Sequence, residues 1–188
     1  MKMNRCIGIG LITLLGMVLS ACGSHVMKPA GAMTEVDNNY ALVSFVRPSA
    51  FGGAIRFSIW DGEEFVGILT AGSMVQHRTT PGEHIFMAHA ENWSYVQANL
   101  EAGRHYIVEG KVFPGVWKAR VGLAPIDVTQ PRYGEKAQKW VNGLKPITVK
   151  PELVDSYVTP RLPEVSKALN VYRQGDAKYG VLEADDGF

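Results

Sequence analysis

Four histidines lie close together in the middle of the chain: His77, His84, His89 and His105. Imidazole nitrogens bind metal ions and carry protons near neutral pH, but a metal site needs several of them on one face. His84 and His89 have an odd separation, which on a regular strand places two side chains on opposite faces. His77 and His84 flank a turn and could lie near each other across it. Without a His-Glu-x-x-His motif or an aspartate-rich loop, the sequence predicts no metal site and favours locally hydrogen-bonded histidines.

An acidic group, Asp61, Glu63 and Glu64, lies beside an expected turn. Two paired carboxylates could act as a general acid and a general base, although a solvated loop is the favoured interpretation. The chain has no Gly-x-Ser-x-Gly nucleophile motif. We therefore expect no catalytic residue and no cofactor. The alternative is an enzyme with an unrecognised site, which would gather the histidines and a carboxylate in a concave pocket.

Aromatic side chains on the expected strands provide one possible binding signal. Trp60, Trp93 and Trp117, with Tyr95, lie on strands, and Trp60 falls on the face opposite the apolar side chains of residues 55–59. Exposed rings there could stack on sugars or contact an apolar partner, which would make the protein a carbohydrate- or peptidoglycan-binding module. The favoured alternative is that C-terminal helices cover these rings.

The first residues have the pattern of a secretory signal. Lys2 and Arg5 form a short cationic start, and the apolar run Ile7 to Leu19 follows. As a helix this run would span about 20 Å, short of the roughly 30 Å hydrocarbon core of a bilayer. It is typical of a cleaved signal peptide rather than a permanent membrane helix.

The sequence Leu19-Ser20-Ala21-Cys22 resembles a bacterial lipobox. That resemblance implies diacylglyceryl transfer to the Cys22 sulfur, cleavage before Cys22, and acylation of the new amino terminus with a fatty acid such as palmitate. Several acyl chains anchor a protein stably, so we expect attachment to the membrane through lipid on Cys22. Gly23 in place of an aspartate implies the outer membrane, facing the periplasm. A plain secretory signal with a chance cysteine is the alternative.

Composition excludes some functions. Of 188 residues, 46% are hydrophobic, as in an ordinary globular domain, and 19 basic residues face 18 acidic ones. This near-balance argues against nucleic-acid binding through bulk charge. The two cysteines, Cys6 and Cys22, would be removed with the signal and consumed by lipid, respectively. The remaining chain would then have no disulfide and no thiol nucleophile.

Apolar and polar side chains alternate between residues 40 and 125, with turn residues such as Asp61-Gly62 and Pro81-Gly82 at short intervals. This pattern predicts an antiparallel β-sandwich of about eight strands joined by hairpin-length connections. The expected strands are residues 41–46, 55–60, 65–70, 74–78, 84–89, 93–100, 105–113 and 116–123.

The rest of the chain has a different character. Ala137, Trp140, Val141 and Leu144 recur at helical spacing, and a second helix is expected within residues 165–172. Residues 147–149 would form an edge strand or an extended segment, and residues 176–188 a tail. The expected organisation is therefore a signal peptide (1–21), a tether (22–39), a β-sandwich domain (40–125) and a small α-helical C-terminal extension with its tail (126–188).

The order of strand ends and turns also carries a resemblance. The motifs are Ala41 to Pro48, Asp61-Gly62, Val66-Gly67-Ile68-Leu69, Ala71-Gly72-Ser73, Pro81-Gly82-x-His84 and Leu100-x-Ala102-Gly103-x-x-Tyr106. Over residues 40–125 the chain resembles a bacterial lipoprotein domain family of unknown function, family 2846. The resemblance implies an antiparallel β-sandwich on a lipid anchor and supplies no catalytic residues. We therefore expect a lipid-anchored envelope lipoprotein with a non-catalytic structural or interaction role, whose partner is an unknown envelope protein or a glycan.

Overall fold

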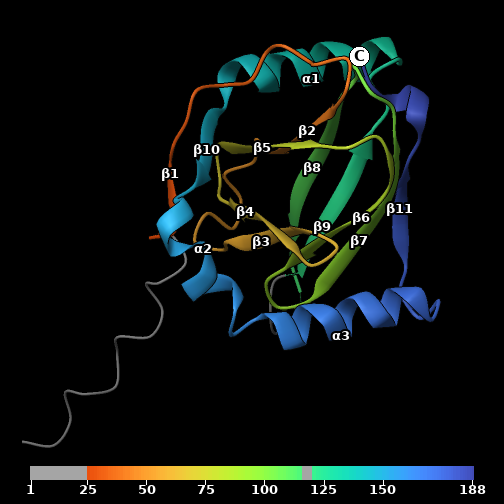
Figure 1. Ribbon diagram of the computed structural model, residues 1–188. Helices are drawn as coiled ribbons and strands as arrows, with labels where there is room; N and C mark the ends of the chain where they lie inside the picture. The colour runs from red at the N-terminus through yellow and green to blue at the C-terminus, as the bar shows by residue number, and fades with distance from the viewer. Residues whose placement is uncertain (1–24, 116–119) are drawn as a thin grey trace, which may run out of the picture.

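The computed structural model describes residues 25–115 and 120–188, which form two β-sheets with helices on their outer sides (Figure 1). The strands are β1 (Met27–Pro29), β2 (Ala41–Arg47), β3 (Phe57–Asp61), β4 (Glu64–Leu69), β5 (Ser73–Thr79), β6 (Gly82–His89), β7 (Trp93–Leu100), β8 (His105–Phe113), β9 (Arg120–Ile126), β10 (Lys145–Val149) and β11 (Tyr179–Leu182). The helices are α1 (Pro131–Gly143), α2 (Pro151–Val158), α3 (Leu162–Arg173) and the 3-10 turn η1 (Ala184–Asp186). Within these described ranges, no helix combines the length and apolar character needed to cross a bilayer.

The predicted mainly β architecture with C-terminal helices is confirmed, but two details of the prediction are wrong. One sheet has six strands in the order β1-β10-β5-β2-β8-β9, and the other has five in the order β11-β7-β6-β3-β4. There are thus more than eight strands. The sheets are also mixed rather than purely antiparallel, because β2 pairs with β8, β10 with β5, and β11 with β7 in parallel.

The topology explains both differences. Only β3–β4, β6–β7 and β8–β9 are consecutive strands that pair as hairpins. The connections at residues 70–72, 80–81 and 101–104 instead carry the chain from one sheet to the other. A tight turn uses the same residue types in a hairpin and at such a corner, so the turn pattern did not reveal which strands pair. The additional strands β1, β10 and β11 come from segments outside residues 40–125.

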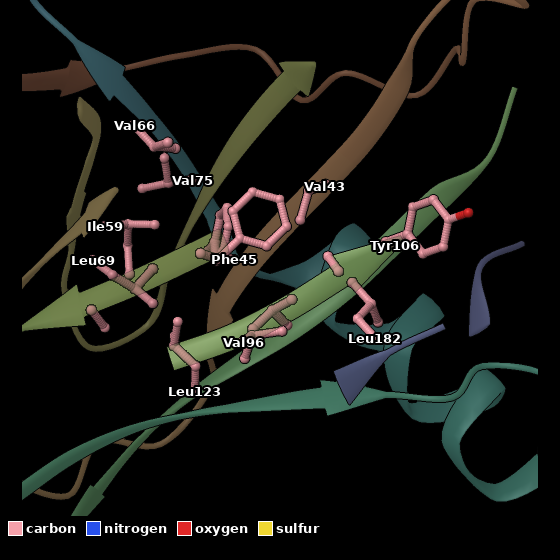
Figure 2. Packing of buried hydrophobic residues seen from close by; sticks show 14 of the residues in the cluster. Val43, Phe45, Ile59, Val66, Leu69, Val75, Val96, Tyr106, Leu123 and Leu182 are labelled. Atoms are coloured by element: carbon pink, nitrogen blue, oxygen red, sulfur yellow. The ribbon is translucent and has the colours of Figure 1, made fainter. Parts of the chain in front are cut away.

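The two sheets face each other across a continuous apolar core (Figure 2). Alternate residues of β2, such as Val43 and Phe45, point into it and have no exposed surface. Phe45 meets Phe86 of the opposite sheet edge-to-face at 5.2 Å between ring centroids. At Gly110 a Cβ would come within 2.7 Å of Phe57 and Leu69, so the close approach of the sheets requires glycine there.

Helices cover the outer faces of the two sheets. α3 lies along the five-stranded sheet, where Val165, Ala168 and Leu169 join a buried apolar cluster with Trp60 and Tyr95. α1 lies on the other side of the molecule, over the six-stranded sheet (Figure 1). Its buried residues, Ala137 and Trp140, form a second outer cluster with residues packed beneath the helix, namely Val46, Met74, Ile107, Ile126 and Val128. The helical spacing seen in the sequence therefore marks faces that bury against sheets.

Both ends of the described chain pack on this body. Val26 is 3% exposed and its carbonyl accepts a hydrogen bond from the Lys150 N–H, while β1 pairs with β10. Part of the expected tether thus belongs to the six-stranded sheet. In the expected tail, Leu182 is fully buried and the Phe188 N–H donates to the His105 carbonyl. Both segments are held by backbone pairing, which leaves little hydrophobic pattern in the sequence.

Candidate functional site

Trp60 is not available to a ligand. The side chain is 1% exposed and lies beneath α3, with its ring centroid 5.1 Å from that of Phe65. Its indole N–H donates to the Ser58 hydroxyl at 2.9 Å, so the polar atom of the ring is satisfied internally. Trp60 does lie opposite the face of Phe57 and Ile59, as predicted, but that face is also buried.

The other aromatic candidates do not form an exposed row with it. Trp93 is half-buried and stacks on His89, with the ring centroids 4.3 Å apart and the planes 14° from parallel. Tyr95 is buried and its hydroxyl donates to the Ala168 carbonyl on α3. Trp117 and the predicted lipidation residue Cys22 lie outside the described residues. The structure therefore turns these strand aromatics toward packing on α3.

Asp61 draws two of the predicted histidines together. It ends β3, and its Oδ2 lies 3.1 Å from His77 Nε2 on β5 and 2.8 Å from His84 Nδ1 on β6. The side chains of all three residues are about nine-tenths buried, at one end of the space between the sheets. Burial raises the pKa of Asp61, but the hydrogen bonds and charges of the two histidines outweigh it and leave that pKa below its ordinary value.

This arrangement stabilises the doubly protonated form of His84. Its Nδ1 faces the Asp61 carboxylate, and its Nε2 lies 2.9 Å from the Thr80 carbonyl oxygen. Both neighbours are acceptors, so both ring nitrogens must carry protons to make both bonds. The hydrogen bond to Asp61, opposed by burial and aided by the carboxylate charge, raises the pKa of His84. His89 lies on the opposite face of β6, against α3, as its odd separation from His84 predicted.

The second polar group forms a row across three strands of the six-stranded sheet. Ser44 on β2 is in register with Gln76 on β5. His105 on β8 pairs with Leu42, two residues before Ser44, and therefore lies on the same outer face. The Ser44 hydroxyl lies 2.8 Å from His105 Nε2 and 3.1 Å from Gln76 Nε2. Ser44 has no exposed surface and His105 is 8% exposed.

The backbone of Met33 fixes the direction of the protons in this row. The Met33 N–H donates to Gln76 Oε1 at 2.6 Å, so the other atom of the amide must be the nitrogen. That nitrogen donates to the Met33 carbonyl and to the Ser44 hydroxyl. The arrangement that also uses the Ser44 proton directs it to His105 Nε2, and in that arrangement a neutral His105 carries its own proton on Nδ1.

His105 stays neutral over the physiological range. Burial lowers the pKa of His105 to about 4, because the imidazolium form would lose hydration without gaining a carboxylate partner. Nδ1 has no hydrogen-bond partner among the described residues. In these residues the one side-chain polar atom that is both fully buried and without a partner is Arg47 Nε, so Nδ1 is not fully buried. The Nδ1–H donor therefore keeps accessible surface.

His105 lines a cavity of about 260 Å³ between α1, residues 34–36 and the C-terminal residues. Polar walls come from Thr34 and from Gln138 and Asn142 on α1. The apolar part is formed by Val36, Val141 and Phe188. Among the described residues no charged side chain lines the cavity, and Gln138, Asn142 and Phe188 are exposed at its mouth. The arrangement suits a small uncharged ligand with hydrogen-bonding atoms.

His105 was recognisable as a candidate in the sequence, but its partners were not. Ser44 was visible as the only hydroxyl in the apolar run 41–46, and a polar residue buried in such a run needs a hydrogen-bond partner. Gln138 and Asn142 gave no signal, because exposed amides on a helix are ordinary surface residues. The Asp61 group differs from the cavity in that its polar atoms are bonded to one another.

Chemically, neither group resembles a metal centre. Among residues 25–115 and 120–188 no set of three or more histidine, cysteine or acidic side chains is arranged to hold a metal ion. His77 and His84 converge on one carboxylate oxygen instead. Comparison of the chain with protein-family models, with curated proteins and with solved structures gave no match.

Proposed function

We propose that this chain is a lipid-anchored protein of the bacterial cell envelope that acts by binding rather than by catalysis. The observation that carries the proposal is the sequence Leu19-Ser20-Ala21-Cys22 directly after a cationic start and an apolar run. A thiol at that position is what diacylglyceryl transfer requires. Gly23 supports sorting to the outer membrane.

The start of the folded body fits such an anchor. Val26 is buried and β1 begins at Met27, so four residue steps separate Cys22 from the packed domain. Fully extended, these steps reach about 14 Å. A lipid on Cys22 would hold the domain close to the bilayer, which raises its effective concentration toward partners in that thin layer.

Binding is supported over acyl transfer by the position of Ser44. Its proton is directed at His105, as in a nucleophile–base pair, but the hydroxyl has no exposed surface that a substrate could reach. The Asp61 carboxylate is likewise occupied by its two histidines. Of the side chains in these two polar groups, His105 is the one that lines the cavity.

Metabolic labelling with a palmitate analogue tests the anchor. We expect label on the full chain, loss of label in Cys22→Ser, and unchanged label in Cys6→Ser, because Cys6 leaves with the signal peptide. Label that survives in Cys22→Ser overturns the proposal. Membrane fractionation of Gly23→Asp tests the destination: we expect a shift from the outer to the inner membrane, and an unchanged distribution contradicts the sorting.

A further inference from the structure

We propose that the cavity beside His105 is a binding site for one uncharged sugar ring. The described residues supply three observations for this assignment: the size of the cavity, an unpaired donor in its wall, and a lining without charged side chains. The proposal goes beyond the anchor and does not depend on it, because the cavity belongs to the folded domain.

The unpaired donor is the strongest of these observations. His105 is more than nine-tenths buried, and the Met33–Gln76–Ser44 chain of hydrogen bonds leaves a proton on its Nδ1. A donor in a low-dielectric wall that has no protein partner binds an acceptor atom more strongly than the same donor in water. A ligand hydroxyl or amide carbonyl oxygen would supply that acceptor.

The remaining lining matches adjacent hydroxyl groups. The amides of Gln138 and Asn142 lie one helical turn apart on α1, and each presents a donor and an acceptor side by side. A sugar hydroxyl both donates and accepts, so neighbouring hydroxyls fit such amides. The exposed Phe188 ring and Val141 offer an apolar surface for the C–H face of the sugar.

Size and charge narrow the ligand class. A volume of about 260 Å³ accommodates one sugar ring. A carboxylate or phosphate would be desolvated in a cavity that offers no cation, which disfavours acidic sugars and nucleotides. A purely apolar ligand would leave the His105 donor and the amides unpaired.

Titration of the full chain in detergent micelles with N-acetylglucosamine, followed by NMR, tests the proposal. We expect a dissociation constant on the order of 1 mM for a ligand of this size, with the largest ¹⁵N shift at His105 Nδ1. Glucuronate is the charged comparison and should bind at least tenfold more weakly.

Variants on α1 locate the site without disturbing the core. Gln138→Ala and Asn142→Ala change exposed residues and should each weaken binding by about fivefold to tenfold through loss of a hydrogen bond. Lys139→Ala, also exposed on α1 but not part of the lining, is the matched control and should bind as the unaltered chain does. No shift at His105, equal binding of glucuronate, or equal binding by the two amide variants would overturn the assignment.

Discussion

A helix covers the outer face of each sheet, but the two helix–sheet interfaces differ. Beneath α3, Trp60, Met87 and Tyr95 of the five-stranded sheet pack directly against apolar side chains of the helix, and this interface is closed. Beneath α1 the six-stranded sheet presents an apolar cluster and, beside it, the polar row that ends at His105. A helix packed on a sheet therefore leaves no cavity where both contacting surfaces are apolar. It leaves a cavity where a row of polar side chains interrupts the apolar surface of the sheet.

The hydrogen bonding of polar atoms also differs between the interfaces beneath α3 and α1. Under α3 the Tyr95 hydroxyl and the Trp60 indole N–H both find acceptors inside the protein. Under α1 the last donor of the row, His105 Nδ1–H, has no acceptor among the described residues. Because Nδ1 keeps accessible surface and His105 lines the cavity, an acceptor atom of a ligand can reach it, which distinguishes this face from the closed layer beneath α3.

Trp60→Ala should have the largest effect, because it empties the centre of the closed layer. We expect a loss of about 4 kcal/mol in the free energy of unfolding, measured by urea denaturation. Trp93→Ala is the comparison; its half-buried ring should cost clearly less. A Trp60 variant as stable as the unaltered chain would show that α3 does not seal this face.

Leu169→Ala and Val141→Ala compare the two helices directly. Leu169 is 4% exposed beneath α3, and its truncation should cost about 3 kcal/mol, whereas the partly buried Val141 at the cavity should cost about 1 kcal/mol. Both values come from chemical denaturation. Equal losses would contradict the contrast between a closed layer and an open one.

His105 should make the α1 face sensitive to acid. Its pKa is about 4 in the folded chain and about 6.5 when unfolded, so below pH 6.5 the unfolded state binds a proton that the folded state does not. Stability therefore falls as the pH drops through this window, by about 2 kcal/mol at pH 5 relative to pH 7. His105→Gln should remove that part of the slope, as unfolding at the two pH values would show. An unchanged slope would mean that His105 is not held neutral.

Tyr95→Phe should have the smallest effect of the four. It deletes the hydroxyl that donates to Ala168 and leaves one helix carbonyl without this partner, at a cost of about 1 kcal/mol. Tyr172→Phe is the control, since its hydroxyl meets Gln97 in a more exposed setting. A larger loss for Tyr172→Phe would contradict the view that the polar atoms beneath α3 are satisfied in its buried layer.

Local pattern was sufficient to predict elements but not their partners. The short apolar run 41–46 and the segment 105–113 located β2 and β8 correctly, because strands covered on both faces are buried at nearly every position. Nothing in either segment states that the two strands pair in parallel, since pairing depends on where the intervening chain changes sheets. The short strands β1 and β11 escaped prediction because backbone bonds to a neighbour, rather than an apolar stripe, hold them.

The candidate site was less predictable for a related reason. His105 was recognised by its residue type, but its tautomer depends on Met33 and Gln76, which lie far from it in the sequence. Asp61 and His84 were each noted, and their contact followed only once β3 and β6 became neighbours. Residue types suggest chemistry, whereas the state of each proton depends on tertiary neighbours.

The parallel pairings also bear on how the chain acquires its structure. β2 can pair with β8, and β5 with β10, only after the later strand has been synthesised. The five-stranded sheet likewise requires β11, which ends at Leu182. Such long loops between partners give a high contact order and folding times of milliseconds to seconds. In a nascent chain the six-stranded sheet is complete only after Val149 and the five-stranded sheet only after Leu182. If residues 1–21 act as the secretory signal that we propose, this delay favours passage through a translocation channel in an extended form, before the domain folds on the far side.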